Sequence, residues 1–271
     1  MTRILVLTLS STLAFAQMPK TAGARDLYFG GFEVPAHQKP VQQVNTPVQT
    51  PQRKSPVATG TTNTPFKPIK ATGPLGLRYS ILKVTGSDVQ EVPVSTRFQA
   101  GERIQIKIQS NSDGFLYIVS QGTSGSWQTV FPSKARSSNR IRAGEDYILP
   151  NNSTMRFAGN PGVEKLFVML TRTPEADLDS VIYNLKSRPV ATEEQAMQIA
   201  SSVIADPLVS KLRSSHTRDL VLEEFSGPVT VIDGAAQPAT AARKIEKAMY
   251  VVSRNQGMDA SVVADIRLVH E

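Results

Sequence analysis

The chain has 271 residues, 40% of them hydrophobic and 20% charged, which is typical of a globular protein with a substantial core. It has no cysteine, which excludes disulfides, zinc–thiolate sites and a cysteine nucleophile. The net charge is +7, but residues 36–74 hold five basic residues and no acidic one, so the remainder is nearly neutral. We therefore expect a basic tail and no nucleic-acid partner, because nucleic-acid-binding domains concentrate positive charge on a folded surface.

The N-terminus has the organisation of a secretory signal peptide. Arg3 precedes an apolar run from residue 4 to residue 13, and Ala14-Phe15-Ala16 follows as a small-residue cleavage site. A buried N-terminal helix is the alternative. The run is too short to span a bilayer, and no later segment reaches the roughly 18 apolar residues that a membrane helix needs. We expect residues 1–16 to be removed, no transmembrane segment, and a periplasmic or extracellular protein.

Residues 17–74 are predicted to be a disordered linker. The stretch 36–74 is rich in Pro, Thr and Gln and has no apolar period, so it cannot bury enough surface to offset the entropy of ordering. Ahead of it, DLYFGGFEV (26–34) is a small aromatic island. This island could be a stray strand or a peptide that adds to a partner's sheet edge. We expect a poorly ordered N-terminus instead.

From residue 75 the apolar residues alternate with period two, which predicts strands at 77–84 and 103–109. Residues 115–120, FLYIVS, are apolar on both faces, as in a strand that is buried on each side. Between them, Asp113-Gly114 predicts a hairpin turn in which Gly114 has positive φ. In this interpretation Asp113 is a turn residue and not a catalytic acid.

The rest of the pattern is β, then helical, then β again. Thr173-Pro174 predicts a helix start, and a capping box at Thr192 predicts a second helix through Ile204 that Pro207 ends. The last two strands are expected to pair across RNQGMDAS. We expect a β-sandwich core at 75–173, a helical insertion at 174–216 and closing strands of the same domain at 217–271. Further strands are predicted at 126–131, 147–149, 155–159, 164–172, 219–225, 249–253 and 262–270.

Between residues 77 and 174 the order of motifs resembles a bacterial family known as domain of unknown function 4384. The resemblance implies an all-β, immunoglobulin-like domain that occurs in exported proteins, and it brings no established activity and no catalytic residues. It rests on LRYSILK (77–83), FQAGERIQIKI (98–108), SNSDGFLYIV (110–119), VFPS (130–133), IRAGEDYILP (141–150) and GVEKLFVML (162–170).

No pattern in the sequence predicts a catalytic, cofactor or metal site. The three histidines, His37, His216 and His270, form no H-x-x-x-H pair. The aromatic residues of the sandwich segment are expected in the core, because buried aromatics dominate sandwich cores. Trp127 and Tyr147 are the two candidates for an exposed interaction surface. Two hypotheses follow: a non-catalytic interaction module that binds an envelope protein or polysaccharide, and an exported hydrolase that acts on envelope glycan or peptide through an unfamiliar site. Converging carboxylates in a cleft would favour the hydrolase.

Overall fold

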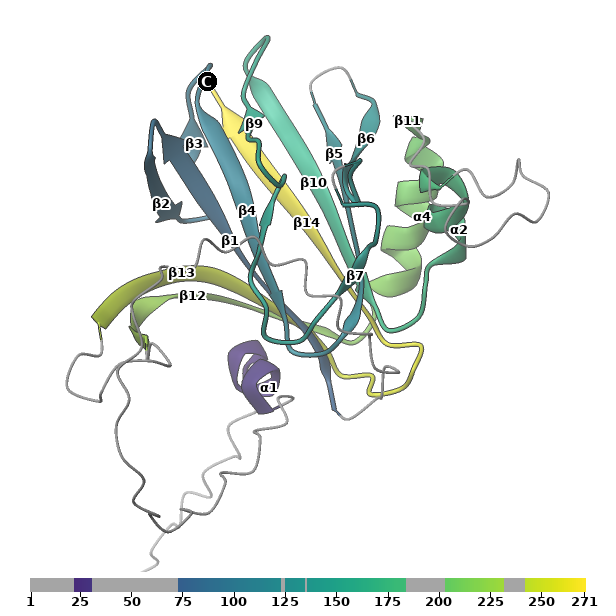
Figure 1. The fold of residues 1–271 in the computed structure, drawn as a ribbon. Helices are drawn as coiled ribbons and strands as arrows, with labels where there is room; N and C mark the ends of the chain where they lie inside the picture. Colours follow the sequence, from purple (N-terminus) through teal and green to yellow (C-terminus); the bar gives the residue numbers. More distant parts are fainter. Residues whose placement is uncertain (1–21, 31–72, 123–124, 135, 184–202, 232–241) are drawn as a thin grey trace, which may run out of the picture.

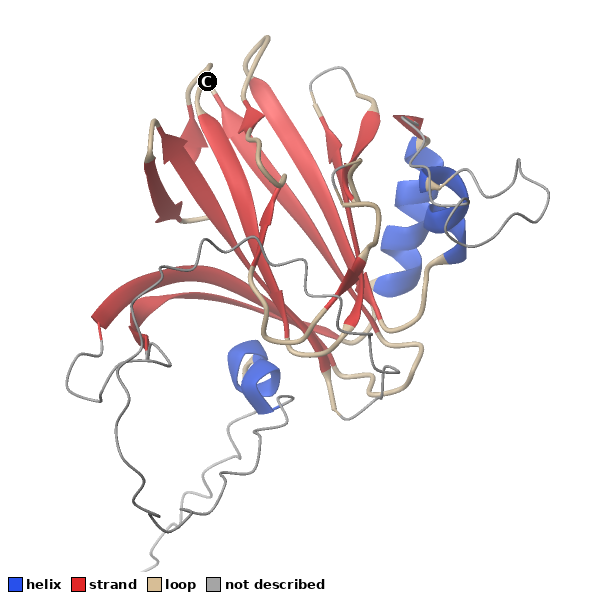
Figure 2. Cartoon of the chain, viewed as in Figure 1, coloured by secondary structure: helices blue, strands red, loops and turns tan. Residues whose placement is uncertain are grey.

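The computed structural model describes residues 22–30, 73–122, 125–134, 136–183, 203–231 and 242–271. Most of these residues lie in two seven-stranded sheets that face each other across a hydrophobic core (Figures 1 and 2). The predicted mainly β sandwich with a helical flank is therefore confirmed. The expected signal peptide (1–16) and most of the expected linker (17–74) lie outside the described residues. Short helices in this part of the chain are α1 (Ala24–Gly30), α2 (Ala176–Ile182) and α4 (Asp206–His216).

The first sheet, sheet A, is antiparallel throughout. Its strand order is β12 (Leu220–Val231), β13 (Ala242–Ser253), β1 (Leu75–Thr85), β4 (Arg103–Ser110) and β8 (Tyr147–Leu149), with β2 (Asp88–Val92) on β1 and β9 (Met155–Arg156) on β4.

One edge of β1 is shared between two partners. Its first half pairs with β13 as far as Tyr79 opposite Met249, and its second half pairs with β2 from Ile81 onward. Strands β12 and β13 therefore leave the sheet and continue together as a curved two-stranded arm, residues 225–231 and 242–248 (Figure 1).

The second sheet, sheet B, places the C-terminal strand in its interior. Strand β14 pairs antiparallel with β10 on one side and parallel with β3 on the other. The order is β11 (Val203–Ile204), β6 (Trp127–Phe131), β5 (Gly114–Gln121), β10 (Gly162–Thr171), β14 (Ser261–His270) and β3 (Arg97–Phe98), with β7 (Arg140–Ile141) on β5.

The core follows from the period-two pattern. Ile104, Ile106 and Ile108 lie on one face of β4 and are fully buried between the sheets. Strand β5 is buried on both faces, as its sequence predicted. Leu116 and Ile118 belong to the inter-sheet core, whereas Tyr117 and Val119 belong to a second cluster beneath α2 and α4.

Two predicted hairpins are wrong. Strand β4 lies in sheet A and β5 in sheet B, so the Asp113-Gly114 segment is a crossover between sheets. Likewise β13 and β14, on either side of RNQGMDAS, belong to different sheets. The turn residues do reverse the chain. An alternating pattern shows which face of a strand is apolar but not which sheet the strand joins. A hairpin within one sheet and a crossover between two sheets both direct that face into the same core.

Helices α2 and α4 cover the outer face of sheet B, with Leu178 and Val209 fully buried there. The predicted helix through Ile204 is wrong where it can be compared. Val203–Ile204 form strand β11 against β6, and the helix starts at Asp206 with Pro207 in its first turn. Proline is favourable there because the first turn leaves its N–H groups unbonded. Residues 184–202, including most of the expected helix, lie outside the described residues.

Helix α1 corrects the expectation of a poorly ordered segment throughout 17–74. It packs on the outer face of sheet A, where Ala24 and Tyr28 are fully buried against Tyr250. The Tyr28 hydroxyl donates to Gln109 Oε1 at 3.1 Å, and Asn111 Nδ2 donates to the Tyr28 carbonyl at 3.0 Å. The four-residue spacing of Ala24 and Tyr28 is the helical period that brings both onto one face.

Candidate functional site

Trp127 and Tyr147, the predicted interaction surface, are not on the surface. Trp127 is 1% exposed and donates from Nε1 to Asp206 Oδ1, 2.8 Å away in the first turn of α4. Tyr147 is 4% exposed, and its hydroxyl accepts from the Arg142 amide at 2.9 Å. Both residues therefore belong to the core and not to a surface. Trp127 packs in the cluster beneath α2 and α4, and Tyr147 packs in the core between the sheets.

Asp113 and Gly114 are structural, but for a different reason from the one predicted. Gly114 is not among the residues with positive φ. It is required by space, since a Cβ atom there would lie 2.8 Å from the Thr171 carbonyl oxygen on the neighbouring strand. Asp113 Oδ1 accepts from the Ala143 amide at 2.9 Å and so fixes the loop that precedes β8.

A polar opening lies at the other end of the sandwich, where β5 ends and β10 begins. Along β5, β10 and β14 the inward face is apolar except near this opening. There the aliphatic residues are replaced by Ser120 near the end of β5, Glu164 near the start of β10 and His270 at the end of β14. The strand register brings these three polar residues to the same end of sheet B. Ser120 lies opposite Leu166, Glu164 opposite Leu268 and His270 opposite Gly162. On these three strands the apolar inward face therefore gives way to polar groups at this end of the inter-sheet space. We call this opening the mouth.

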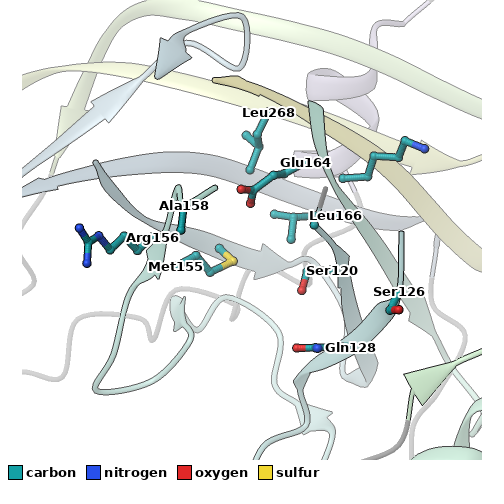
Figure 3. A pocket seen from close by; sticks show the side chains of 11 residues that line it. Ser120, Ser126, Gln128, Met155, Arg156, Ala158, Glu164, Leu166 and Leu268 are labelled. Atoms are coloured by element: carbon teal, nitrogen blue, oxygen red, sulfur yellow. The ribbon is translucent and has the colours of Figure 1, made fainter. Parts of the chain in front are cut away.

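The mouth contains a cavity of about 340 Å³. Figure 3 shows Glu164 between Leu268 and Leu166, with Met155 facing them from β9 and the Arg156 guanidinium pointing away. The lining thus combines an aliphatic wall with a few polar groups, a mixture typical of small-ligand sites. It consists of Ser120, Gly122, Ser126, Gln128, Met155, Arg156, Ala158, Glu164, Lys165, Leu166 and Leu268.

Glu164 is the carboxylate of this cavity, and it accepts no hydrogen bond from the residues that the structure describes. Its Oε1 lies 4.0 Å from His270 Nε2, beyond hydrogen-bonding distance. Burial raises the pKa of Glu164, and the nearby His270 only partly opposes that shift. The His270 side chain is completely buried and stacks on Phe157, and neither ring nitrogen has a hydrogen-bond partner.

The sequence analysis missed Glu164 and did not assign His270 to a site. A signal was present: each is the single ionisable residue that interrupts an alternating apolar face at the end of a strand. The signal becomes informative only when the strands are aligned, and the register of β10 and β14 is not readable from the sequence.

A second hollow, the sheet A groove, lies on the outer face of sheet A between the arm and strands β1 and β2. It has a volume of about 530 Å³. Its rim includes three exposed apolar side chains, Ile245 (63% exposed), Val89 (50%) and Ile148 (44%). The lining consists of Leu82, Val89, Gln90, Glu91, Lys107, Asp146, Ile148, Lys244, Ile245 and Lys247.

The carboxylate at the base of the groove is fully paired. The Glu91 side chain is 4% exposed and accepts from Lys107 Nζ at 2.6 Å and Lys244 Nζ at 3.0 Å. Burial opposes ionisation, but the hydrogen bonds from Lys107 and Lys244 hold the pKa of Glu91 below its usual value. A carboxylate in this state does not serve as a general acid near neutral pH.

A buried ion pair links the groove to α1. The Arg78 guanidinium donates to Glu246 on β13, and the Tyr250 hydroxyl donates to the same carboxylate oxygen at 3.0 Å. Tyr250 in turn packs edge-on against Tyr28 of α1. The outer face of sheet A is thus one continuous surface, which α1 covers at one end and the groove leaves open at the other.

The remaining histidines make no metal site. His216 lies at the C-terminal end of α4 with Nδ1 2.8 Å from Ser261 Oγ, and His37 lies outside the described residues. Within the part of the chain that the structure describes, no three His, Asp or Glu side chains gather in a way that could hold a metal ion. Nor does that part contain a helix of the length and hydrophobicity needed to cross a bilayer.

The fold defines a two-sheet β-sandwich with a helical flank, and sequence comparison agrees with the predicted resemblance. Residues 97–174 match the model of a family described as Domain of unknown function (DUF4384). The match extends from β3 through β10 to Pro174, so it includes Ser120 and Glu164, while LRYSILK (77–83) and His270 lie outside it. No curated protein and no solved structure matches the chain.

Proposed function

We propose that this chain is an exported, non-catalytic interaction module of the bacterial cell envelope that binds a protein partner through the sheet A groove. The observation that carries the proposal is the gathering of exposed Ile245, Val89 and Ile148 around one hollow with lysines at its rim. Contiguous apolar surface with a polar rim is typical of protein interaction sites.

The nature of the partner follows from the adjoining surface. Sheet A already binds one short peptide segment, since α1 buries Ala24 and Tyr28 on β13 beside Tyr250. The groove continues this surface along β13 to Lys244. A partner that presents a short segment with apolar side chains would fit the sheet A groove, because it could bury those side chains there as α1 buries Ala24 and Tyr28 on the covered part of the sheet.

A site-specific cross-link tests the proposal in the producing cells. A photoreactive residue at position 245 should give an adduct with one envelope protein, and Val89→Asp should abolish it. Val163, 43% exposed on β10 of the other sheet, is the matched control, for which no adduct is expected. Equal adducts at both positions, or binding to envelope polysaccharide that survives protease treatment of the envelope, would contradict a protein partner.

Export is supported by the organisation of residues 1–16. Mass spectrometry of the protein from the envelope or medium should give a mature N-terminus at Gln17. A protein that retains Met1 would contradict this part of the proposal.

A further inference from the structure

We propose that the mouth is a binding site for a primary ammonium group on an aliphatic stem, with Glu164 as its counter-ion. The site is separate from the sheet A groove, and its argument does not depend on the proposed function. The shared chemistry could come from a small alkylamine or from the side chain of a lysine in a peptide.

Glu164 accepts no hydrogen bond from the described residues, and His270, 4.0 Å away, is an ion-pair partner only when its ring is protonated. The Glu164 side chain is 23% exposed and partly desolvated, and a carboxylate in such a place is normally paired with a cation. Neither cation of the cavity lining pairs with it. Lys165 Nζ donates to Gln121 Oε1 at 3.1 Å, and the Arg156 guanidinium points away from the cavity (Figure 3).

A buried histidine lies behind Glu164. His270 is completely buried, with both ring nitrogens lacking a hydrogen-bond partner and Nε2 4.0 Å from Glu164 Oε1. A buried polar group without a partner costs stability, and the His270 ring offers Glu164 no hydrogen bond. His270 does not line the cavity, whereas Glu164 does, so Glu164 is the group whose polar partners a ligand can complete.

The rest of the cavity lining is aliphatic on one side and carries neutral polar groups on the other. Leu166, Leu268 and Met155 form an aliphatic wall, while the Ser120 hydroxyl and the Gln128 amide supply oxygen acceptors. A primary ammonium has three donors and no acceptor, so one carboxylate and two neutral oxygens can satisfy it. The aliphatic wall is matched by a methylene stem and has no counterpart in a hydrated metal ion.

Titration of the full mature chain with n-butylamine tests the site, with amide chemical shifts of Ser120, Leu166 and Leu268 as the readout. We expect saturable shifts that are confined to the mouth, and binding at least about tenfold weaker in Glu164→Gln, since about 1.4 kcal/mol separates tenfold affinities. Glu224→Gln, which changes an exposed carboxylate on β12, is the matched control and should bind as the unaltered chain does.

Further titrations separate the possible ligands. n-Butanol, which has the same stem without the charge, should give no saturable shifts. Stronger binding of a short peptide with a free lysine side chain and an acetylated N-terminus than of n-butylamine would assign the ammonium to a partner's lysine, and the reverse order would assign it to a small amine. The proposal fails if n-butanol binds as well as n-butylamine, if Glu164→Gln binds normally, or if only a divalent cation such as Mn²⁺ shifts these amides.

Discussion

The two ends of the sandwich differ in how many hydrogen bonds the chain itself makes to their buried polar side chains. At the end where β1, β5 and β14 begin, which we call the closed end, Asn111 donates to the Tyr28 and Pro74 carbonyls and accepts from the Gly76 amide. Arg172 Nη1 and Nη2 donate there to the carbonyls of Gly73, Gln256 and Gly257, whereas its buried Nε has no hydrogen-bond partner among the described residues. At the mouth, Glu164 and His270 lie 4.0 Å apart without a hydrogen bond.

This contrast separates the parts of the chain that hold the fold from the part that is free to bind. A buried polar group that is satisfied by the chain contributes to stability, whereas an unsatisfied one costs free energy unless a ligand completes it. Substitutions at the closed end should therefore change stability, and substitutions at the mouth should leave stability nearly unchanged.

The largest effect is expected from Arg172→Leu. The Arg172 side chain, 2% exposed as a residue, ties the start of β1 to the connection between β13 and β14. Its loss removes three hydrogen bonds that a charged, buried side chain donates to part-buried carbonyls, so we expect destabilisation by at least about 3 kcal/mol in urea unfolding. Arg156→Leu, at the exposed rim of the mouth, is the control and should change stability by less than about 0.5 kcal/mol.

Equal stability of the Arg172 and Arg156 variants would contradict the distinction between the two ends.

The second-largest change in stability is expected from Gly114→Ala, with Gly122→Ala at the other end of β5 as its comparison. Gly114→Ala places a Cβ atom 2.8 Å from the Thr171 carbonyl oxygen, which must move. We expect a loss of about 1–3 kcal/mol from this overpacking. Gly122→Ala meets nothing within 4 Å, so it should be neutral or slightly stabilising. Thermal unfolding of both variants measures the difference, and a stable Gly114→Ala protein would show that the closed end is less tightly packed than described.

Asp113 should show a smaller effect. Asp113→Ala removes the acceptor for the Ala143 amide, for which we expect about 1 kcal/mol of destabilisation. Asp113→Asn keeps an oxygen at the same position and should remain close to the unaltered protein in thermal unfolding. If Asp113→Asn were as damaging as Asp113→Ala, the negative charge and not the hydrogen bond would be the important property.

The sequence predicts the strands better than it predicts their partners. Alternating apolar residues located β4 near 103–109 and β14 near 262–270, because period two reports burial on one face directly. Which sheet a strand joins depends on long-range packing. For this reason the chain reversals at Asp113-Gly114 and at RNQGMDAS were predicted as hairpins, although each connects one sheet to the other.

The candidate sites were less predictable than the strands. Trp127 was selected for its residue type, but its exposure is decided by α4, whose Asp206 accepts its indole N–H. Glu164 and His270 are 106 positions apart in the chain and meet only through the register of β10 and β14. No local pattern contains that register, so the mouth could be recognised only in the folded chain.

The smallest expected effect is a pH dependence that has opposite signs at two carboxylates. Burial raises the pKa of Glu164, so the folded state holds this proton more tightly than the unfolded state does. Its contribution to stability is therefore greatest below the usual carboxyl pKa and declines as the pH rises through the usual value toward the folded one. Glu164→Gln cannot ionise, so it should match the unaltered chain in acid and exceed it near neutral pH by less than about 1 kcal/mol.

Glu91 provides the opposite sign as a control. Lys107 and Lys244 overcome the effect of burial and hold the pKa of Glu91 below its usual value, so its contribution is present above that value and is lost as the pH falls toward the folded pKa. Glu91→Gln should therefore be less stable than the unaltered chain near neutral pH, with a deficit that shrinks in acid. Urea unfolding between about pH 3 and pH 7 measures both variants. If Glu164→Gln were also less stable than the unaltered chain near neutral pH, Glu164 would have a cationic partner within the chain. The carboxylate of the mouth would then not require a cationic ligand.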